Sequence, residues 1–382
     1  MALTSASSRR VRRVGWGQRL SRWDIRLSPY LYISPFFILF AVFGAFPLVF
    51  NIVVALHDWH RRAGMGEFVG LDNFAWVLQQ QLFWRSLENT ISIFLLGGIP
   101  QLILALLIAS VLDQNLRART FWRMLSIFPL YAAAMYGSST TTEIARAVGT
   151  LPRWLPTLHL FENFWQVFTT EQFDFWLAFA NSLLVAAAVS ASVVFFSTLA
   201  GFSFAKLRFR GSQVLYVAVL ATLIIPAQVG TVPLFVMMTD FGWIDSLLAL
   251  VVPGLVGAFG VFWMTQYLKE ALPYELIEAA RVDGASLFRT FWSIGLPAAR
   301  PAAATLALFT FIGSWNSFFW PSVVMRSQLT MPLVVPQLRG AFTSDTGLVM
   351  AGVFLVAAPL LLVLAIAGRQ LVAGVMAGAV KG

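Results

Sequence analysis

The chain of 382 residues contains no cysteine and only three histidines, and charged residues make up just 11% of it. The lack of cysteine excludes disulfides, thiolate metal ligands and a cysteine nucleophile. His57, His60 and His159 are too few and too scattered to indicate a metal site. The sequence also has no HExxH, GxSxG or paired-carboxylate pattern, and no phosphate loop of the GxxxxGK type. We therefore expect no metal site, no catalytic residue and no ATP hydrolysis by this chain itself.

Hydrophobic residues, in contrast, make up 59% of the sequence and raise its mean hydropathy to +0.77, which is typical of an integral membrane protein. A helix needs roughly 20 apolar residues to cross the hydrocarbon core of a bilayer. The sequence therefore predicts an all-α integral membrane protein with about eight transmembrane helices, the third of them short. The expected spans are residues 35–56, 90–112, 121–137, 178–203, 214–238, 246–267, 301–323 and 347–368.

The 26 Lys and Arg exceed the 17 Asp and Glu and give a net charge of +9, and the basic residues are distributed unequally between the two sides of the predicted membrane topology. If eight helices cross, most of these residues share one side of the membrane with the basic N-terminal segment 1–27. The positive-inside rule then places both termini in the cytoplasm, and the basic excess indicates topology rather than a nucleic-acid partner. All 17 carboxylates lie outside the eight spans or at their edges. Ion-coupled carriers usually keep an ionisable group at membrane depth, so we expect an energy source outside the membrane.

One loop between apolar spans, residues 270–300, carries its own helical signals. Asp283-Gly284 is a turn dipeptide, because glycine takes a positive φ without strain. Ser286 can cap a helix that follows this turn, and Gly295 with Pro297 is expected to end that helix. The pattern predicts two short amphipathic helices at about a right angle, outside the bilayer. Taken alone, it also fits an ordinary interfacial helical loop.

The same loop contains Glu278-Ala279-Ala280-Arg281-Val282-Asp283-Gly284 followed by Ile294-Gly295-Leu296-Pro297, which resembles the EAA loop of binding-protein-dependent ABC importers. The resemblance implies a type I ABC importer permease bundle with one cytoplasmic EAA coupling loop. It also implies a separate ATPase dimer that docks there and carries ATP and Mg, while this chain has no cofactor. Asp283 is either a plain turn former or a partner of Arg281. The implied ATPase-coupling residues are Glu278, Ala279, Ala280, Asp283, Gly284, Ile294, Leu296 and Pro297.

The resemblance covers most of the chain, but in two parts. Residues 162–382 are similar to a MalG-type permease of the carbohydrate-uptake importers without its first span, and they include the motif Gly313-Ser-Trp-Asn-Ser-Phe318. Residues 28–136 instead resemble the opening of the partner MalF type, beginning with Ser28-Pro-Tyr30. We expect a MalF-like head with three spans at 28–137, an external joint at 138–173, and a MalG-like permease domain with five spans at 174–382, which contains the EAA loop 270–300.

A substrate path is predicted from the few polar and aromatic residues of the late spans. Sugars bind to aromatic faces and amide groups, and amides in a membrane helix are costly unless they face a cavity or a neighbouring helix. A hydrogen bond between helices is the alternative for Asn316. Pro226 and Pro233 are expected to break the fifth span. The candidate substrate-path residues are Gln228, Trp315, Asn316 and Trp320.

The resemblance implies a multi-pass permease subunit of the bacterial plasma (inner) membrane that moves a carbohydrate or related polyol inward. Its implied partners are the ABC ATPase dimer, a second permease subunit, an extracytoplasmic substrate-binding protein and the lipid bilayer. Two alternatives stay open: a non-functional fusion of two permease genes, and an ion-coupled secondary carrier. The sequence leaves open which sugar or polyol is carried and whether the permease pair is homo- or heterodimeric.

Overall fold

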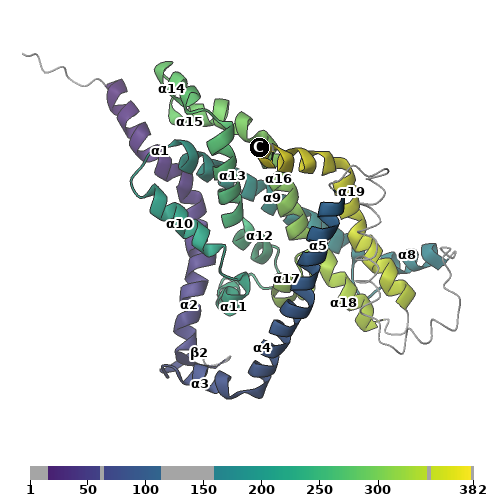
Figure 1. Ribbon diagram of the computed structural model, residues 1–382. Coiled ribbons are helices and arrows are strands. Elements are labelled where there is room, and N and C mark those ends of the chain that lie inside the picture. Colours follow the sequence, from purple (N-terminus) through teal and green to yellow (C-terminus); the bar gives the residue numbers. More distant parts are fainter. Residues whose placement is uncertain (1–15, 61–63, 113–158, 342–345, 380–382) are drawn as a thin grey trace, which may run out of the picture. The chain divides into compact units, whose positions relative to one another are not determined.

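The computed structural model describes residues 16–60, 64–112, 159–341 and 346–379, and helices dominate these parts of the chain (Figure 1). The sheet found there is one antiparallel pair, β1 (His57–His60) with β2 (Gly64–Phe68). The predicted all-α membrane class is confirmed. The chain divides into two compact units, Met1–Asn51 with Leu160–Gly382, and Ile52–His159.

Five helical segments of the described residues are long and apolar enough to cross a membrane. They overlap the first, second, fourth, sixth and seventh expected spans. The eighth lies in α19 (Thr346–Ala379), whose apolar stretch Leu348–Val363 is shorter. The third expected span, 121–137, and most of the expected joint lie outside the described residues. The five segments are Trp23–Ala55, Gln81–Leu107, Phe175–Lys206, Leu248–Ala271 and Leu287–Val324.

The first segment joins α1 (Trp16–Phe40), a π-helical turn (Ala41–Ala45) and α2 (Phe46–Ala55). The buried positions of α1 recur every three to four residues, so they form one helical face. This face packs against α9, and α1 therefore belongs to the same unit as the C-terminal body rather than to the residues 52–159 that follow it. The buried residues are Ser28, Pro29, Tyr32, Ile33 and Phe36.

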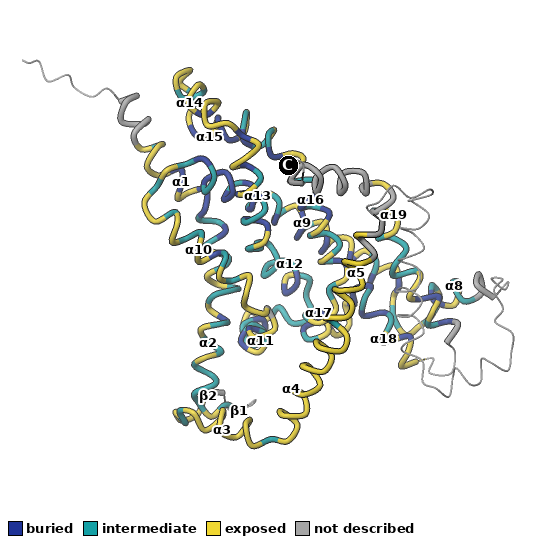
Figure 2. The backbone as a smooth tube through the Cα atoms, in the orientation of Figure 1, coloured by how far each residue is buried: buried dark blue, intermediate teal, exposed yellow. Residues whose placement is uncertain are grey.

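The core of this unit forms around α9 (Phe175–Lys206). Asp174 caps the helix, since its Oδ1 accepts a hydrogen bond from the Leu177 N–H at 2.9 Å. Helices α13 (Ala258–Ala271) and α16 (Leu296–Trp315) pack on it. Gly201 allows the close approach of α13, because a Cβ at this position would lie 2.7 Å from the Met264 Cβ. The buried positions of these helices are visible in Figure 2.

The fifth expected span is not one helix. It consists of α10 (Ser212–Thr222), a 3₁₀ turn (Ala227–Gly230) and α11 (Thr231–Asp240). The predicted break at Pro226 is confirmed, since this residue is extended with φ −61° and ψ 129°. The predicted break at Pro233 is wrong, because Pro233 lies in the first turn of α11, where a helix does not need its N–H.

Asp245, between α11 and α12 (Leu248–Gly254), holds the loop that follows α17 (Phe319–Val324). It has a φ of 60°, and its Oδ1 accepts hydrogen bonds from the N–H groups of Arg326, Ser327 and Gln328 at 2.8, 2.9 and 3.1 Å. Burial raises the pKa of Asp245, but these bonds and one from the Ser327 hydroxyl outweigh it and lower the pKa from 3.8 to about 2. Helices α18 (Met331–Ala341) and α19 follow.

The second unit contains α3 (Asp72–Gln79), α4 (Gln81–Ile93), a π-helical turn (Phe94–Gly98) and α5 (Ile99–Leu112). Asn73 of α3 binds the junction between α2 and β1, since its Nδ2 donates to the carbonyls of Ala55 and His57 at 3.0 and 2.9 Å. Wherever burial is described, α4 and α5 are exposed along their length, as Figure 2 shows. Apolar side chains on such a surface suit contact with lipid.

Candidate functional site

The predicted EAA loop contains α14 (Tyr274–Val282) and α15 (Leu287–Thr290). A Schellman motif ends α14: the Ala285 N–H donates to the Ala280 carbonyl at 2.9 Å, and the Gly284 N–H donates to the Arg281 carbonyl at 3.1 Å. Gly284 has a φ of +81°, which this motif requires and which glycine adopts without strain. Ser286 caps α15, because its Oγ accepts a hydrogen bond from the Arg289 N–H at 3.2 Å.

The coupling candidates of α14 and its turn are largely exposed. Glu278, Ala279, Asp283 and Gly284 are exposed and Ala280 is half-buried, whereas Ile277 of the same helix is only 3% exposed and anchors it. Ile294 and Leu296, which follow α15, are half-buried, and Pro297 is exposed. The motif therefore displays a small-residue surface with one carboxylate on each side of Ala279 and Ala280.

The same loop and the π-helical turn after it expose five large apolar side chains that were not among the predicted coupling residues. Their exposure outside the predicted spans is the kind of feature that marks a protein–protein contact. Val282 directly follows Arg281 in the motif and is 86% exposed, so its place within the EAA motif is the signal that could have identified it. The exposed residues are Tyr274, Leu276, Val282, Phe288 and Trp292.

The prediction that Gly295 and Pro297 end the second helix is wrong. A π-helical turn (Phe291–Gly295) joins α15 directly to α16, and the Leu296 N–H donates to the Phe291 carbonyl. Pro297 is the second residue of α16, where its missing N–H is tolerated because the π-helical turn shifts the hydrogen-bond pattern. Gly295 serves close packing instead, since a Cβ there would lie 2.8 Å from the ring of Phe202.

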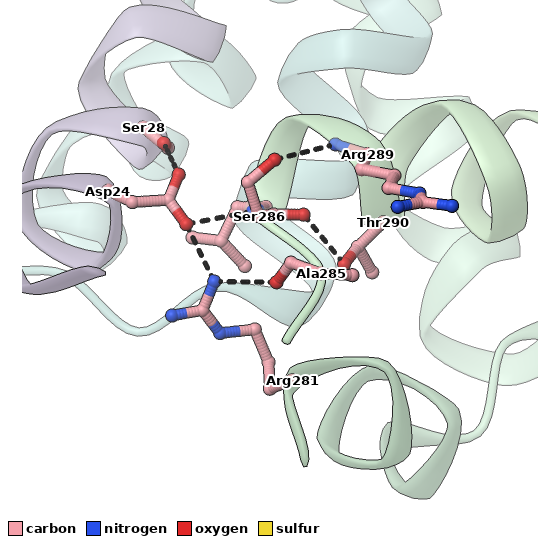
Figure 3. Close-up of polar contacts among 8 residues, drawn as sticks. Asp24, Ser28, Arg281, Ala285, Ser286, Arg289 and Thr290 are labelled. Carbon is pink, nitrogen blue, oxygen red and sulfur yellow. Dashed lines mark hydrogen bonds and ion pairs between the residues drawn. The ribbon is translucent and has the colours of Figure 1, made fainter. Parts of the chain in front are cut away.

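Asp24 of α1 also belongs to this site, although it was not among the residues predicted from the sequence (Figure 3). Its Oδ2 accepts hydrogen bonds from Arg281 Nη1 at 2.6 Å and from the Leu287 N–H at 2.9 Å, and its Oδ1 accepts one from Ser28 Oγ at 2.8 Å. Arg281 Nη1 also donates to the Ala285 carbonyl at 2.9 Å. The available signal was that Asp24 is the one carboxylate in the otherwise basic segment 1–27.

A cavity of about 450 Å³ lies within the first unit, between parts of α9, α12, α13, α16 and α17. Most of its wall is apolar, and among the described residues that line it none is charged. The hydroxyl of Thr330 is buried without a hydrogen-bond partner among the described residues. The cavity can therefore hold an uncharged molecule that offers both apolar faces and hydrogen-bonding groups. Its polar lining residues are Ser182, Thr310, Ser314, Ser317, Trp320 and Thr330.

Of the four substrate-path candidates, the structure brings Trp320 to this cavity, with its Nε1 donating to the Ala249 carbonyl at 2.8 Å. Trp315 is 1% exposed and packs between helices, since its Nε1 donates to the Val356 carbonyl of α19 at 3.1 Å. Asn316 is exposed at the end of α16, and Gln228 is exposed in the 3₁₀ turn. The hydroxyl groups of the lining were missed, although Ser314 and Ser317 flank two of the candidates in sequence.

The fold and the loop define a multi-pass membrane permease. The family described as "Binding-protein-dependent transport system inner membrane component" matches residues 196–373, which include the loop 270–300. The chain belongs to this family, whose members are the membrane components of ABC importers and are not themselves catalytic.

Curated relatives support the assignment. The chain is 31% identical over 264 residues to the arabinooligosaccharides transport system permease protein AraQ of Halalkalibacterium halodurans, a match that covers 69% of this chain and 94% of the relative. It is 34% identical to the lactose transport system permease protein LacG of Rhizobium radiobacter, over 67% of this chain and 92% of the relative. UgpE of Yersinia enterocolitica, an sn-glycerol-3-phosphate transport system permease protein, is 30% identical over 58% of this chain and 79% of its own length.

A solved structure shares the fold. One chain of a bacterial ABC transporter involved in the import of the acidic polysaccharide alginate aligns with a TM-score of 0.50 and 22% identity. The alignment covers 67% of this chain and 98% of that one.

Proposed function

We propose that this chain is the permease subunit of an ATP-binding-cassette importer that moves a neutral carbohydrate or related polyol into the cell. The observation that carries the proposal is the exposed EAA motif on the Schellman turn between α14 and α15. A separate ATPase docks there and supplies the energy, and ATP with Mg is bound by that partner.

The coupling residues have distinct roles in this proposal. Ala279, Ala280 and Gly284 leave room for a protruding group of the ATPase to approach the backbone. Glu278 and Asp283, both exposed, attract basic groups of the ATPase. Ile294 lies in the π-helical turn, and Leu296 and Pro297 are the first two residues of α16; these three residues carry the displacement of the loop toward the cavity.

The remaining partners follow from the membrane arrangement. We propose that both termini and the EAA loop face the cytoplasm, and that an extracytoplasmic binding protein delivers the substrate to the opposite face. A second permease subunit completes the transport pathway, because the importers that this chain resembles use two permease bundles. The MalF-like character of residues 28–137 stays part of the proposal.

The substrate class rests on the charge of the cavity. The relatives named above carry arabinooligosaccharides, lactose or sn-glycerol-3-phosphate, according to their names. An anionic substrate needs compensating positive groups, since an unpaired charge is costly at membrane depth. The described lining of this cavity has none, and its aromatic ring and hydroxyl groups suit a neutral sugar.

The docking test is co-elution of the detergent-purified chain with its candidate ATPase. We expect the native chain to bind, and Glu278→Arg and Gly284→Pro to bind much more weakly, because one reverses the charge and the other cannot adopt a φ of +81°. Glu171→Arg, the same charge change at an exposed residue outside the loop, is the matched control and should bind like the native chain. A well-folded native chain that does not bind would refute the importer mechanism.

The substrate test uses the assembled importer in liposomes. Neutral oligosaccharides delivered by the binding protein should accumulate, whereas sn-glycerol 3-phosphate should not. Accumulation of the anion at a comparable rate would refute the argument from the uncharged cavity, while leaving the docking result intact.

A further inference from the structure

We infer that Asp24 is a positioning residue for energy coupling. Its contacts join α1 to both helices of the EAA loop, so that α1 moves together with the loop. The inference rests on the proposed function, because it assigns a role in the transmission of the ATPase stroke. Asp24 is not part of the EAA motif and lies more than 250 positions before it in the chain.

The carboxylate of Asp24 joins the two helices of the loop to each other. Through Oδ2 it binds Arg281 in the last turn of α14 and the N–H of Leu287, the first residue of α15. A helix N-terminus favours a negative charge, and hydrogen bonds between ionised groups are stronger than neutral ones. Asp24 therefore fixes the angle between α14 and α15 from outside the loop.

The ion pair is sheltered from water. The side chains of Arg281 and Asp24 are 21% and 17% exposed, and Ser28, which donates to the second carboxylate oxygen, is buried. Exposed ion pairs contribute little, whereas removing one partner of a sheltered pair leaves the other charge poorly solvated. The contact is thus strong enough to persist while the loop is displaced.

A second set of contacts binds the same end of α1 to the body. The ring of Tyr32 lies against those of Phe202 in α9 and Phe291 in the π-helical turn, with centroids 6.3 and 5.9 Å apart. Ser203 Oγ donates to the Pro29 carbonyl at 3.0 Å. A displacement of α15 therefore reaches α1 both at Asp24 and, two turns further along α1, at Tyr32.

The test uses the complete importer in liposomes and measures substrate transported per ATP hydrolysed. Asp24→Asn removes the charge at nearly constant shape, and we expect this ratio to fall by about tenfold, equivalent to about 1.4 kcal/mol, with the ATPase still bound. Asp24→Glu should recover most of the ratio, and Glu171→Gln, an exposed control, should leave it unchanged. An unchanged ratio in Asp24→Asn would overturn the inference, even if transport and ATP hydrolysis both fell in the same proportion.

The absence of cysteine from the chain allows a second test that does not depend on the stability of Asp24→Asn. A variant carrying Asp24→Cys and Arg281→Cys can be joined by a short bifunctional thiol reagent. If α1 moves with the loop, joining the two positions should restore most of the coupling ratio lost in the unjoined variant. Transport that stays low or stops after joining would show that α1 and the loop must separate, and would overturn the inference. A native importer that does not transport at all would instead refute the proposed function.

Discussion

The contact between α9 and α13 gives the sharpest prediction about the body of the permease. At Gly201 an added Cβ would meet Met264 Cβ at 2.7 Å, the Met264 carbonyl carbon at 3.0 Å and the Thr265 backbone nitrogen at 3.0 Å. Two of these atoms belong to the backbone, so a side-chain rotation cannot relieve the clash, and α13 must move away. Overpacking of this kind costs about 1–3 kcal/mol. Alanine is favoured over glycine within a helix by about 1 kcal/mol, which offsets part of that cost.

We therefore expect Gly201→Ala to lower the thermal stability of the detergent-purified chain, by a net amount of up to about 2 kcal/mol. Gly340→Ala in α18 is the matched control, because no other atom of the described residues beyond its own helix turn lies within 4 Å of a Cβ there, and the helix preference alone should make it neutral or stabilising. The assay is the temperature at which half of the monodisperse protein is lost, measured by the intrinsic tryptophan fluorescence of the size-exclusion peak. Equal stability of the two variants would refute the packing argument.

Three further predictions concern the loops and the cavity. Gly284→Ala should weaken ATPase co-elution without unfolding the chain, because its φ of +81° costs an alanine about 1 kcal/mol and there is no steric clash; native-like binding would contradict this. Asp245 is stabilising above its ordinary pKa of 3.8 and loses that contribution as the pH falls toward about 2. Between pH 5 and 3 the native chain should therefore lose thermal stability more steeply than Asp245→Asn; parallel curves would contradict this. Thr310→Asp should abolish uptake of a neutral sugar in liposomes, since it places an unpaired carboxylate in the cavity wall. Asn316→Asp, at an exposed position at the end of the same helix, should retain uptake.

Local signals predicted the turn and the helix cap of the loop 270–300 correctly, because both are set by short-range chemistry. Ser286 as a cap and Gly284 as the left-handed residue each act within a few positions of the chain. The predicted helix end at Pro297 was wrong because proline usually ends a helix, and the sequence does not reveal the π-helical turn that accommodates it. Asp24 was missed for a different reason: its partners at Arg281 and Leu287 are distant in sequence, and one carboxylate in a basic segment reads as a surface charge.

The cavity shows the same limit. Trp320 was proposed because aromatic residues near a span end are conspicuous, and the structure places it in the cavity wall, but Trp315 is buried between helices and Asn316 is exposed. Which side of a helix faces a cavity depends on its packing partners, which are set by contacts such as that of Gly201 with Met264. The placement of α1 with the C-terminal body likewise depends on a buried face that only the packed structure reveals.

The π-helical turn at Phe291–Gly295 has a consequence for the phase of the helix that contains it. From Leu287 to Trp315 the backbone is continuous, and Phe288 near one end is exposed while Thr310 near the other lines the cavity. One residue of an α-helix turns the chain by about 100°. The extra residue in the π-helical turn therefore sets which side of α16 meets the cavity relative to the side of α15 that is displayed outside. Deleting one residue of this turn would leave the helix continuous but rotate Thr310 out of the cavity wall. A displacement of α15 would then still move α16, but a different face of α16 would line the cavity.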